Sequence, residues 1–446
     1  MANESFARAK SAPLLNLQWG LMGPEQLAGS RRTRTLGLGA AVRKFNQLAV
    51  PGLGGVWFAN QIFLATLGVR VADRLRPLSA NVKAIEIANA IEALACWCAF
   101  GDNGWESDPR LRGRQKLAGK RDLTFTQLRK PRFYVTQPMR MATVEALVSL
   151  GFVEPGSQRF NGFRCTQSGM DLLAAGTAGY RPNNSTVEDY LCARAKDNAS
   201  ISNMGALREA LSPLVVLQPN ARELIRDKLC EGSGRNPSAA RRKNALSWVR
   251  SIDATNPTGW EAKPSALETN HWDDLRLGAR FFTARDAAID VLNAIEAQMV
   301  PLAAPKLNAD NAHKLSAVQT RLESLRAVAK RFLDEDKDPT EGRMATVFCR
   351  ECVEADPAAI IRNLVKRDDR VLRLVGTDVL PGAAFSLQPQ TDISDEEGEG
   401  PGADNAGRVP VPADISSRIH NLYLLDLDIQ GRLGAFLNPP AAEEAA

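Results

Sequence analysis

The residues best suited to chemistry in this sequence are two cysteines that are separated by two residues. Cys349 and Cys352 form the one Cys-x-x-Cys pair among seven cysteines. Thiolates at this spacing can bind Zn²⁺ or an iron–sulfur cluster, or act as a redox pair. A tetrahedral metal site needs two more ligands, and Cys192 and Cys230 are candidates if the fold brings them over. The alternative is that both cysteines simply share one helical turn, so metal binding stays an open hypothesis.

The motifs of common enzyme classes are missing. The sequence has no phosphate-binding loop, no G-x-S-x-G, no H-E-x-x-H and no dinucleotide fingerprint. It has three histidines, of which His271 precedes Trp272-Asp273-Asp274. An N-cap role explains Asp273 more simply than catalysis does. We therefore expect a protein that is not itself catalytic.

Residues 109–132 are strongly basic. They contain nine lysines and arginines and a single acid, Asp122. A run of charge is usually a solvated face, but this run has one sign and directly precedes the most distinctive motif of the chain. Such a surface can neutralise nucleic-acid phosphates. The basic residues are Arg110, Arg112, Arg114, Lys116, Lys120, Arg121, Arg129, Lys130 and Arg132.

Residues 122–176 predict a specific order of elements. A short helix at 123–128 precedes a second helix that starts near Thr136, an N-cap residue type, and ends at Leu150-Gly151. Two strands joined by Pro155-Gly156-Ser157 follow, and then a helix opens at 166–169. In the second helix we expect an apolar face that is buried and a polar face that points outward. The expected buried residues are Met141, Val144, Leu147 and Val148, and the expected outward residues are Gln137, Arg140, Thr143 and Glu145.

This order, with Leu-Gly-Phe-Val-Glu at 150–154 and Phe-Arg-Cys-Thr-Gln-Ser-Gly at 163–169, resembles the winged helix-turn-helix of MarR-like and PadR-like bacterial regulators. The resemblance covers about 55 residues. It implies that the helix before Leu150-Gly151 is a recognition helix and that the two strands form a wing. Lys130-Pro131-Arg132 lengthens the preceding turn relative to that pattern.

The resemblance implies a set of double-stranded DNA contacts. Gln137, Arg140 and Thr143 would face the major groove, where Arg pairs with guanine and Gln with adenine. Arg159 and Arg164 on the wing would meet phosphate or the minor groove, contacts that position the protein without reading sequence. The adjoining basic residues Arg129, Lys130 and Arg132 would add phosphate contacts.

Length and composition indicate a multidomain, mainly α-helical protein. The chain has 446 residues, of which 44% are hydrophobic, and its 56 Lys and Arg against 51 Asp and Glu give a net charge of +5. One apolar core rarely serves so long a chain. We expect a flexible basic arm (1–35), an N-terminal helical region (36–118), a central winged helix with a two-stranded wing (119–178), a long helical domain with a helical hairpin (179–345), a small α+β element with the Cys-x-x-Cys pair and a β-hairpin (346–388), an acidic disordered linker (389–412) and a C-terminal docking helix (413–440).

The sequence favours a cytoplasmic location. The N-terminus has no apolar leader, and scattered, odd-numbered cysteines are typical of reduced thiols. Residues 45–69 carry no charge and are long enough to span a bilayer. Pro51, three nearby glycines and Asn60-Gln61 argue instead for a loop followed by a buried helix, so we expect no membrane span.

These features lead to one preferred function and two alternatives. The preferred hypothesis is a DNA-binding protein without catalytic activity, acting as a subunit of a larger bacterial DNA-acting assembly of the antiphage-defence or mobile-element kind. One alternative is a structural adaptor whose winged helix and C-terminal helix bind protein partners. The other is a nucleic-acid enzyme that depends on a metal held by the cysteines.

Overall fold

The structure is a computed structural model. It describes residues 34–78, 82–121, 123–157, 159–198, 201, 205–231, 237–253, 259–385 and 409–439. The basic arm predicted at 1–35 lies outside these ranges except for Arg34 and Thr35, and the acidic linker predicted at 389–412 lies outside them up to residue 408. The prediction of a mainly helical chain is confirmed, because the described residues form helices with only a two-stranded and a three-stranded sheet.

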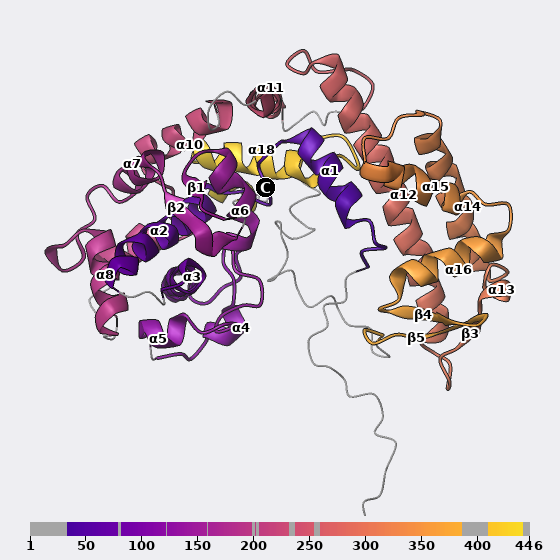
Figure 1. Cartoon of the computed structure of the whole chain (residues 1–446), viewed down its shortest axis with the longest axis horizontal. Coiled ribbons are helices and arrows are strands. Elements are labelled where there is room, and N and C mark those ends of the chain that lie inside the picture. The colour runs from indigo at the N-terminus through magenta and orange to yellow at the C-terminus, as the bar shows by residue number, and fades with distance from the viewer. Residues whose placement is uncertain are drawn as a thin grey trace, which may run out of the picture.

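The described residues bury two apolar cores, and each core defines a lobe. Figure 1 shows the lobes side by side, with α1 (Gly39–Ala49) and α18 (Ser417–Ile429) between them. Leu38, Ala41 and Phe45 belong to the core of the second lobe, whereas Ala49 and Val50 at the end of α1 belong to the core of the first. The short helix α1 is therefore shared by both lobes.

The first lobe is built around a pair of apolar helices, α2 (Ala59–Leu75) and α3 (Ala84–Asp102). They pack closely because α2 has Gly68 at the contact, where an added Cβ would lie 2.5 Å from the Ala88 Cβ. The other helices and 3₁₀ turns of this lobe are η1 (Arg76–Leu78), α4 (Arg114–Leu117), α5 (Phe125–Leu128), α6 (Arg140–Ser149), η2 (Phe160–Gly162), α7 (Gln167–Gly176), η3 (Pro182–Asn184), α8 (Val187–Asp197), α9 (Gly205–Leu211), α10 (Pro219–Glu231), α11 (Pro237–Ser251) and α19 (Leu433–Leu437).

The two predicted wing strands are present in the first lobe. β1 (Val153–Pro155) pairs antiparallel with β2 (Phe163–Cys165), with Val153 opposite Cys165. Thr166 ends the hairpin and caps α7: its hydroxyl accepts from the Gly169 backbone N–H at 3.1 Å and donates to the Gly151 carbonyl at 2.7 Å. The turn after α6 has Gly151 at φ +78°, a conformation that favours glycine.

The second lobe is built around the long helix α12 (Thr269–Met299), which packs along α14 (Ser316–Leu333). Three strands form its sheet in the order β3-β5-β4, and β3 comes from the segment between these two helices. Residues 346–385 therefore share a core with the helical hairpin rather than forming one of their own. The remaining elements are β3 (Leu307–Asn308), α13 (Ala309–Ala312), η4 (Glu341–Arg343), α15 (Met344–Cys352), α16 (Pro357–Asp368), β4 (Leu372–Val375) and β5 (Asp378–Pro381).

The C-terminal helix packs on the chain's own body. Ile419, Leu422 and Leu425 of α18 lie in the first core, and the helix stops at Gly431, where φ is +75°. The single helix expected within 413–440 is therefore two, α18 and α19. In the described residues, one helix has the length and composition to cross a membrane, α3, and 78% of its apolar window is buried in the first lobe. The apolar character of α3 therefore fits its place in the core of the first lobe.

Candidate functional site

The predicted recognition helix, α6, turns a different face outward from the one expected. Arg140 is 8% exposed and Thr143 is fully buried, whereas Met141 is 45% exposed. The Arg140 Nε donates to Asn89 Oδ1 at 2.8 Å, and its guanidinium lies 5.5 Å from the centre of the Phe160 ring. The prediction that Arg140 and Thr143 point outward is therefore wrong.

The orientation of α6 follows from a carboxylate on another helix. Glu92 of α3 is completely buried, and it accepts from the Tyr134 hydroxyl at 2.5 Å and from the Arg140 backbone N–H at 2.8 Å. Burial raises the pKa of Glu92, while these two hydrogen bonds and the nearby guanidinium of Arg140 oppose that rise. A buried carboxyl group needs such partners, so the start of α6 is held against α3. The sequence did carry a signal for Glu92, since it is an acid within an otherwise apolar helical stripe.

Gln137 also belongs to this interior arrangement. Its backbone carbonyl accepts from Arg112 Nη1 at 3.0 Å, and Arg112 itself is buried. The Gln137 side-chain oxygen is buried without a hydrogen-bond partner. Of the three residues expected in the major groove, Arg140 and Thr143 are buried and Gln137 is half-buried.

The predicted phosphate contacts, in contrast, lie on the surface. Arg159 and Arg164 on the hairpin are exposed, although Arg164 Nη1 lies 3.7 Å from Asp73. Arg129, Lys130 and Arg132 are exposed in the turn after α5. Arg110 and Arg112 of the same basic stretch are buried, because Arg110 pairs with Asp108 at 2.8 Å and Arg112 binds Gln137.

We define the basic loop patch as six exposed cations from α4 and from the neighbouring loops that follow α4 and α5. The loop after α4 and the loop after α5 touch where Lys120 Nζ lies 5.7 Å from the centre of the Phe133 ring. Both loops pack on α3, since the Trp97 indole donates to the Lys120 carbonyl and α3 contacts α5. Within the described residues, no carboxylate forms an ion pair with any of the six. They are Arg114, Lys120, Arg121, Arg129, Lys130 and Arg132.

The structure does not bring the four candidate metal-binding cysteines together. Cys349 and Cys352 are fully buried in α15 of the second lobe, whereas Cys192 and Cys230 lie in α8 and α10 of the first (Figure 1). Burial raises the pKa of Cys349 to about 12 and that of Cys192 to about 11, so both thiols hold their protons at neutral pH. Among the described residues no group of three or more potential ligands could hold a metal ion.

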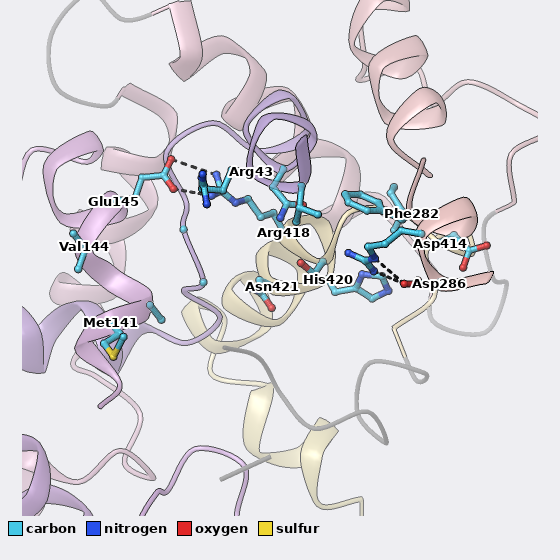
Figure 2. Close-up of a pocket in the computed structure, with 18 residues that line it drawn as sticks. Arg43, Met141, Val144, Glu145, Phe282, Asp286, Asp414, Arg418, His420 and Asn421 are labelled. Atoms are coloured by element: carbon cyan, nitrogen blue, oxygen red, sulfur yellow. Dashed lines mark hydrogen bonds and ion pairs between the residues drawn. The ribbon is translucent and has the colours of Figure 1, made fainter. Parts of the chain in front are cut away.

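Sequence reasoning missed a cavity of about 690 Å³ between the lobes. We call it the interlobe cavity. Figure 2 shows α6 on one side of it with Met141 and Val144, and α12 on the other with Phe282. Residues of α18 lie between these two walls, and α1 contributes Val42 and Arg43. Because its walls come from four separate parts of the chain, no local pattern could have indicated it.

Ion pairs within the walls balance most of the charge around the interlobe cavity. Arg418 of α18 is 8% exposed and donates to Glu145 of α6 at 2.7 Å. Arg285 donates to Asp286 at 2.7 Å along α12. Burial lowers the pKa of His420, whose ring also bonds the Ser416 carbonyl, so the imidazole is neutral at pH 7.

One polar group in this cavity lacks a partner. Asn421 is 4% exposed and lines the cavity, and its side-chain amide makes no hydrogen bond within the described part of the chain. A buried amide is normally paired, because leaving its donors and acceptors unmet costs free energy. Asn421 therefore marks the cavity as a place where a bound molecule would meet an available donor and acceptor.

Comparisons with known proteins found no relative of this chain: no family model, no curated protein and no solved structure matches it.

Proposed function

We propose that the chain is a double-stranded DNA-binding protein without catalytic activity, acting in the bacterial cytoplasm as one subunit of a larger DNA-acting assembly. The observation that carries this proposal is the basic loop patch. Six exposed cations, none of which pairs with a carboxylate within the described residues, lie in α4 and in the loops after α4 and α5, which pack against one helix. Cations that have no carboxylate partner are free to replace the counterions of a phosphate backbone.

The order of elements around α6 supports the same proposal. Helix α6, the antiparallel pair β1 and β2, and helix α7 follow each other as in a winged helix. The hairpin also presents Arg159 and Arg164 on the surface. Positively charged side chains beside such a hairpin are suited to phosphate contacts.

The interior position of Arg140 and Thr143 changes the expected kind of recognition. Base readout needs side chains that reach into a groove, and these two are committed to the protein interior. We therefore propose that the protein holds the DNA backbone with little sequence preference. Specific site selection would then come from other subunits of the assembly.

Binding to a labelled duplex across a salt series tests the proposal. The test variant replaces Arg129, Lys130 and Arg132 with Ala, and the matched control replaces Arg321, Lys330 and Arg331, three exposed cations of α14 in the other lobe. The wild type should bind with a steep salt dependence. The test variant should flatten the slope of log K against log salt by about 2–3, because each lost phosphate contact contributes about 0.9.

Both variants remove three positive charges, so the comparison separates a located surface from a general charge effect. Equal losses in the two variants would show that the patch is not the binding surface. No binding by the wild type at low salt would overturn the DNA proposal itself.

A further inference from the structure

We infer that the interlobe cavity is a binding site for a small planar heterocycle of the nucleobase type, held by the Asn421 amide through a paired donor and acceptor. This inference rests on the cavity and does not depend on the DNA-binding proposal. A volume of about 690 Å³ is in the range that takes one small organic molecule. Its position between two apolar cores is a common place for such sites.

The walls of the interlobe cavity suit a flat apolar ring. Met141 and Val144 face it from α6, and Phe282 faces it from α12 (Figure 2). Met141 is one of the few large apolar side chains among the described residues that are strongly exposed, at 45%. The Arg285 guanidinium lies 5.2 Å from the centre of the Phe282 ring, so the apolar surface that a bound ring would bury is mainly that of Met141 and Val144, which favours binding.

The polar groups of the cavity point to recognition by an edge rather than by net charge. Arg418 is neutralised by Glu145 and Arg285 by Asp286, so these guanidinium groups are already paired. The Asn421 amide supplies one donor and one acceptor side by side, which matches the donor–acceptor edge of a nucleobase. A peptide ligand would need several donors and acceptors to pair with its backbone amides. The described walls offer one unpartnered amide, which suits a single small ring better.

A charged substituent would find one further group at the rim. Arg43 of α1 lines the cavity, is exposed and has no ion-pair partner among the described residues. It can attract a phosphate that extends from the heterocycle toward solvent. We therefore expect a nucleoside monophosphate to bind more tightly than its nucleoside, with the base directed to Asn421.

Ligand-observed NMR and calorimetry on the full chain test the inference, with adenosine, guanosine, cytidine and uridine and their monophosphates as probes. At least one nucleoside should bind with one-to-one stoichiometry. Asn421→Leu should weaken that binding about tenfold or more, since it removes the hydrogen-bonding edge. Val144→Trp should also weaken it, because the indole occupies part of the cavity. Arg43→Gln should remove the preference for the monophosphate over the nucleoside.

Thermal unfolding and a control variant distinguish a lost binding site from a misfolded protein. Asn421→Leu should unfold at a temperature equal to or above that of the wild type, because an unpartnered amide is replaced by an apolar group of similar size. Thr320→Trp, in the shallow hollow between α12 and α14, is the control and should leave binding intact. Absence of binding by all probes at millimolar concentration would overturn the inference, and so would binding that survives both Asn421→Leu and Val144→Trp.

Discussion

The guanidinium of Arg34 donates from Nε to Asp368 Oδ2 at 3.1 Å, although 334 residues separate the two in the sequence. Its Nη2 donates to Glu296 at 2.8 Å, and all three side chains are at most 6% exposed. Asp368 also accepts from the backbone N–H of Leu372 at the start of β4. This contact connects the beginning of the described chain to α12, to the end of α16 and to the sheet of the second lobe.

Replacing Arg34 with Gln should destabilise the second lobe strongly. The change removes the cation that these two buried carboxylates share, and removal of one partner of a buried ion pair costs about 3–5 kcal/mol. Urea unfolding followed by circular dichroism measures it. Arg321→Gln, an exposed arginine of α14, is the control and should change the unfolding free energy by less than about 0.5 kcal/mol. Equal stability of the two variants would mean that Arg34 does not hold this site together.

Arg242 should be a second stabilising cation, and within the described residues it binds carbonyl groups rather than a carboxylate. It is fully buried, and it donates to the carbonyl of Leu229 at 3.2 Å and to that of Pro51 at 2.9 Å, near the C-terminal ends of α10 and α1. A cation is favourable at these helix ends, where carbonyl groups lack partners. Arg242→Met should therefore lower the unfolding free energy by about 2–4 kcal/mol, since both carbonyls lose their donor. The neighbouring Lys243→Met, at an exposed position, should have little effect.

His271 should make stability depend on pH below neutrality. It is 1% exposed, its Nε2 lies 2.8 Å from the Ala49 carbonyl, and burial lowers its pKa below 6.5. As the pH falls through 6.5, His271 is protonated in the unfolded chain but stays neutral in the folded chain, so the free energy of unfolding decreases. His271→Gln removes this loss. The difference in unfolding free energy between wild type and variant should therefore be larger at pH 7.5 than at pH 5.5, and a constant difference would contradict the assignment.

The cysteines should differ in reactivity according to their burial. Cys349 and Cys352 are fully buried with raised pKa values, whereas Cys230 is only partly buried. In the native protein a thiol-specific reagent at pH 8 should label Cys230 well before the α15 pair, because the thiolate is the reacting form. Mass spectrometry of the labelled peptides gives the order. Early labelling of Cys349 would show that α15 opens readily and that its thiols are available to react.

Local sequence determined much of the secondary structure. Thr166 followed by Gly169 predicts a capped helix, and α7 begins there. Leu150-Gly151 predicts the end of a helix, and Gly151 adopts the positive φ that this ending needs. The two short strands β1 and β2 follow from turn residues between short apolar runs, and they pair as expected. Each of these features depends on neighbours within a few residues, so the local pattern contains the necessary information.

Tertiary structure alone decided which face of α6 lies inside and where a ligand can bind. Arg140 and Thr143 of α6 are buried because Glu92, 48 residues before Arg140, needs the Arg140 backbone N–H as a donor. A sequence pattern shows that polar residues share a face, but it cannot show that another helix supplies a buried carboxylate to meet them. The interlobe cavity likewise exists only where Val144, Phe282 and Asn421 meet from three distant segments. Pairing of buried polar groups and the shape between packed helices depend on contacts across the whole chain, and these are set when the two lobes come together.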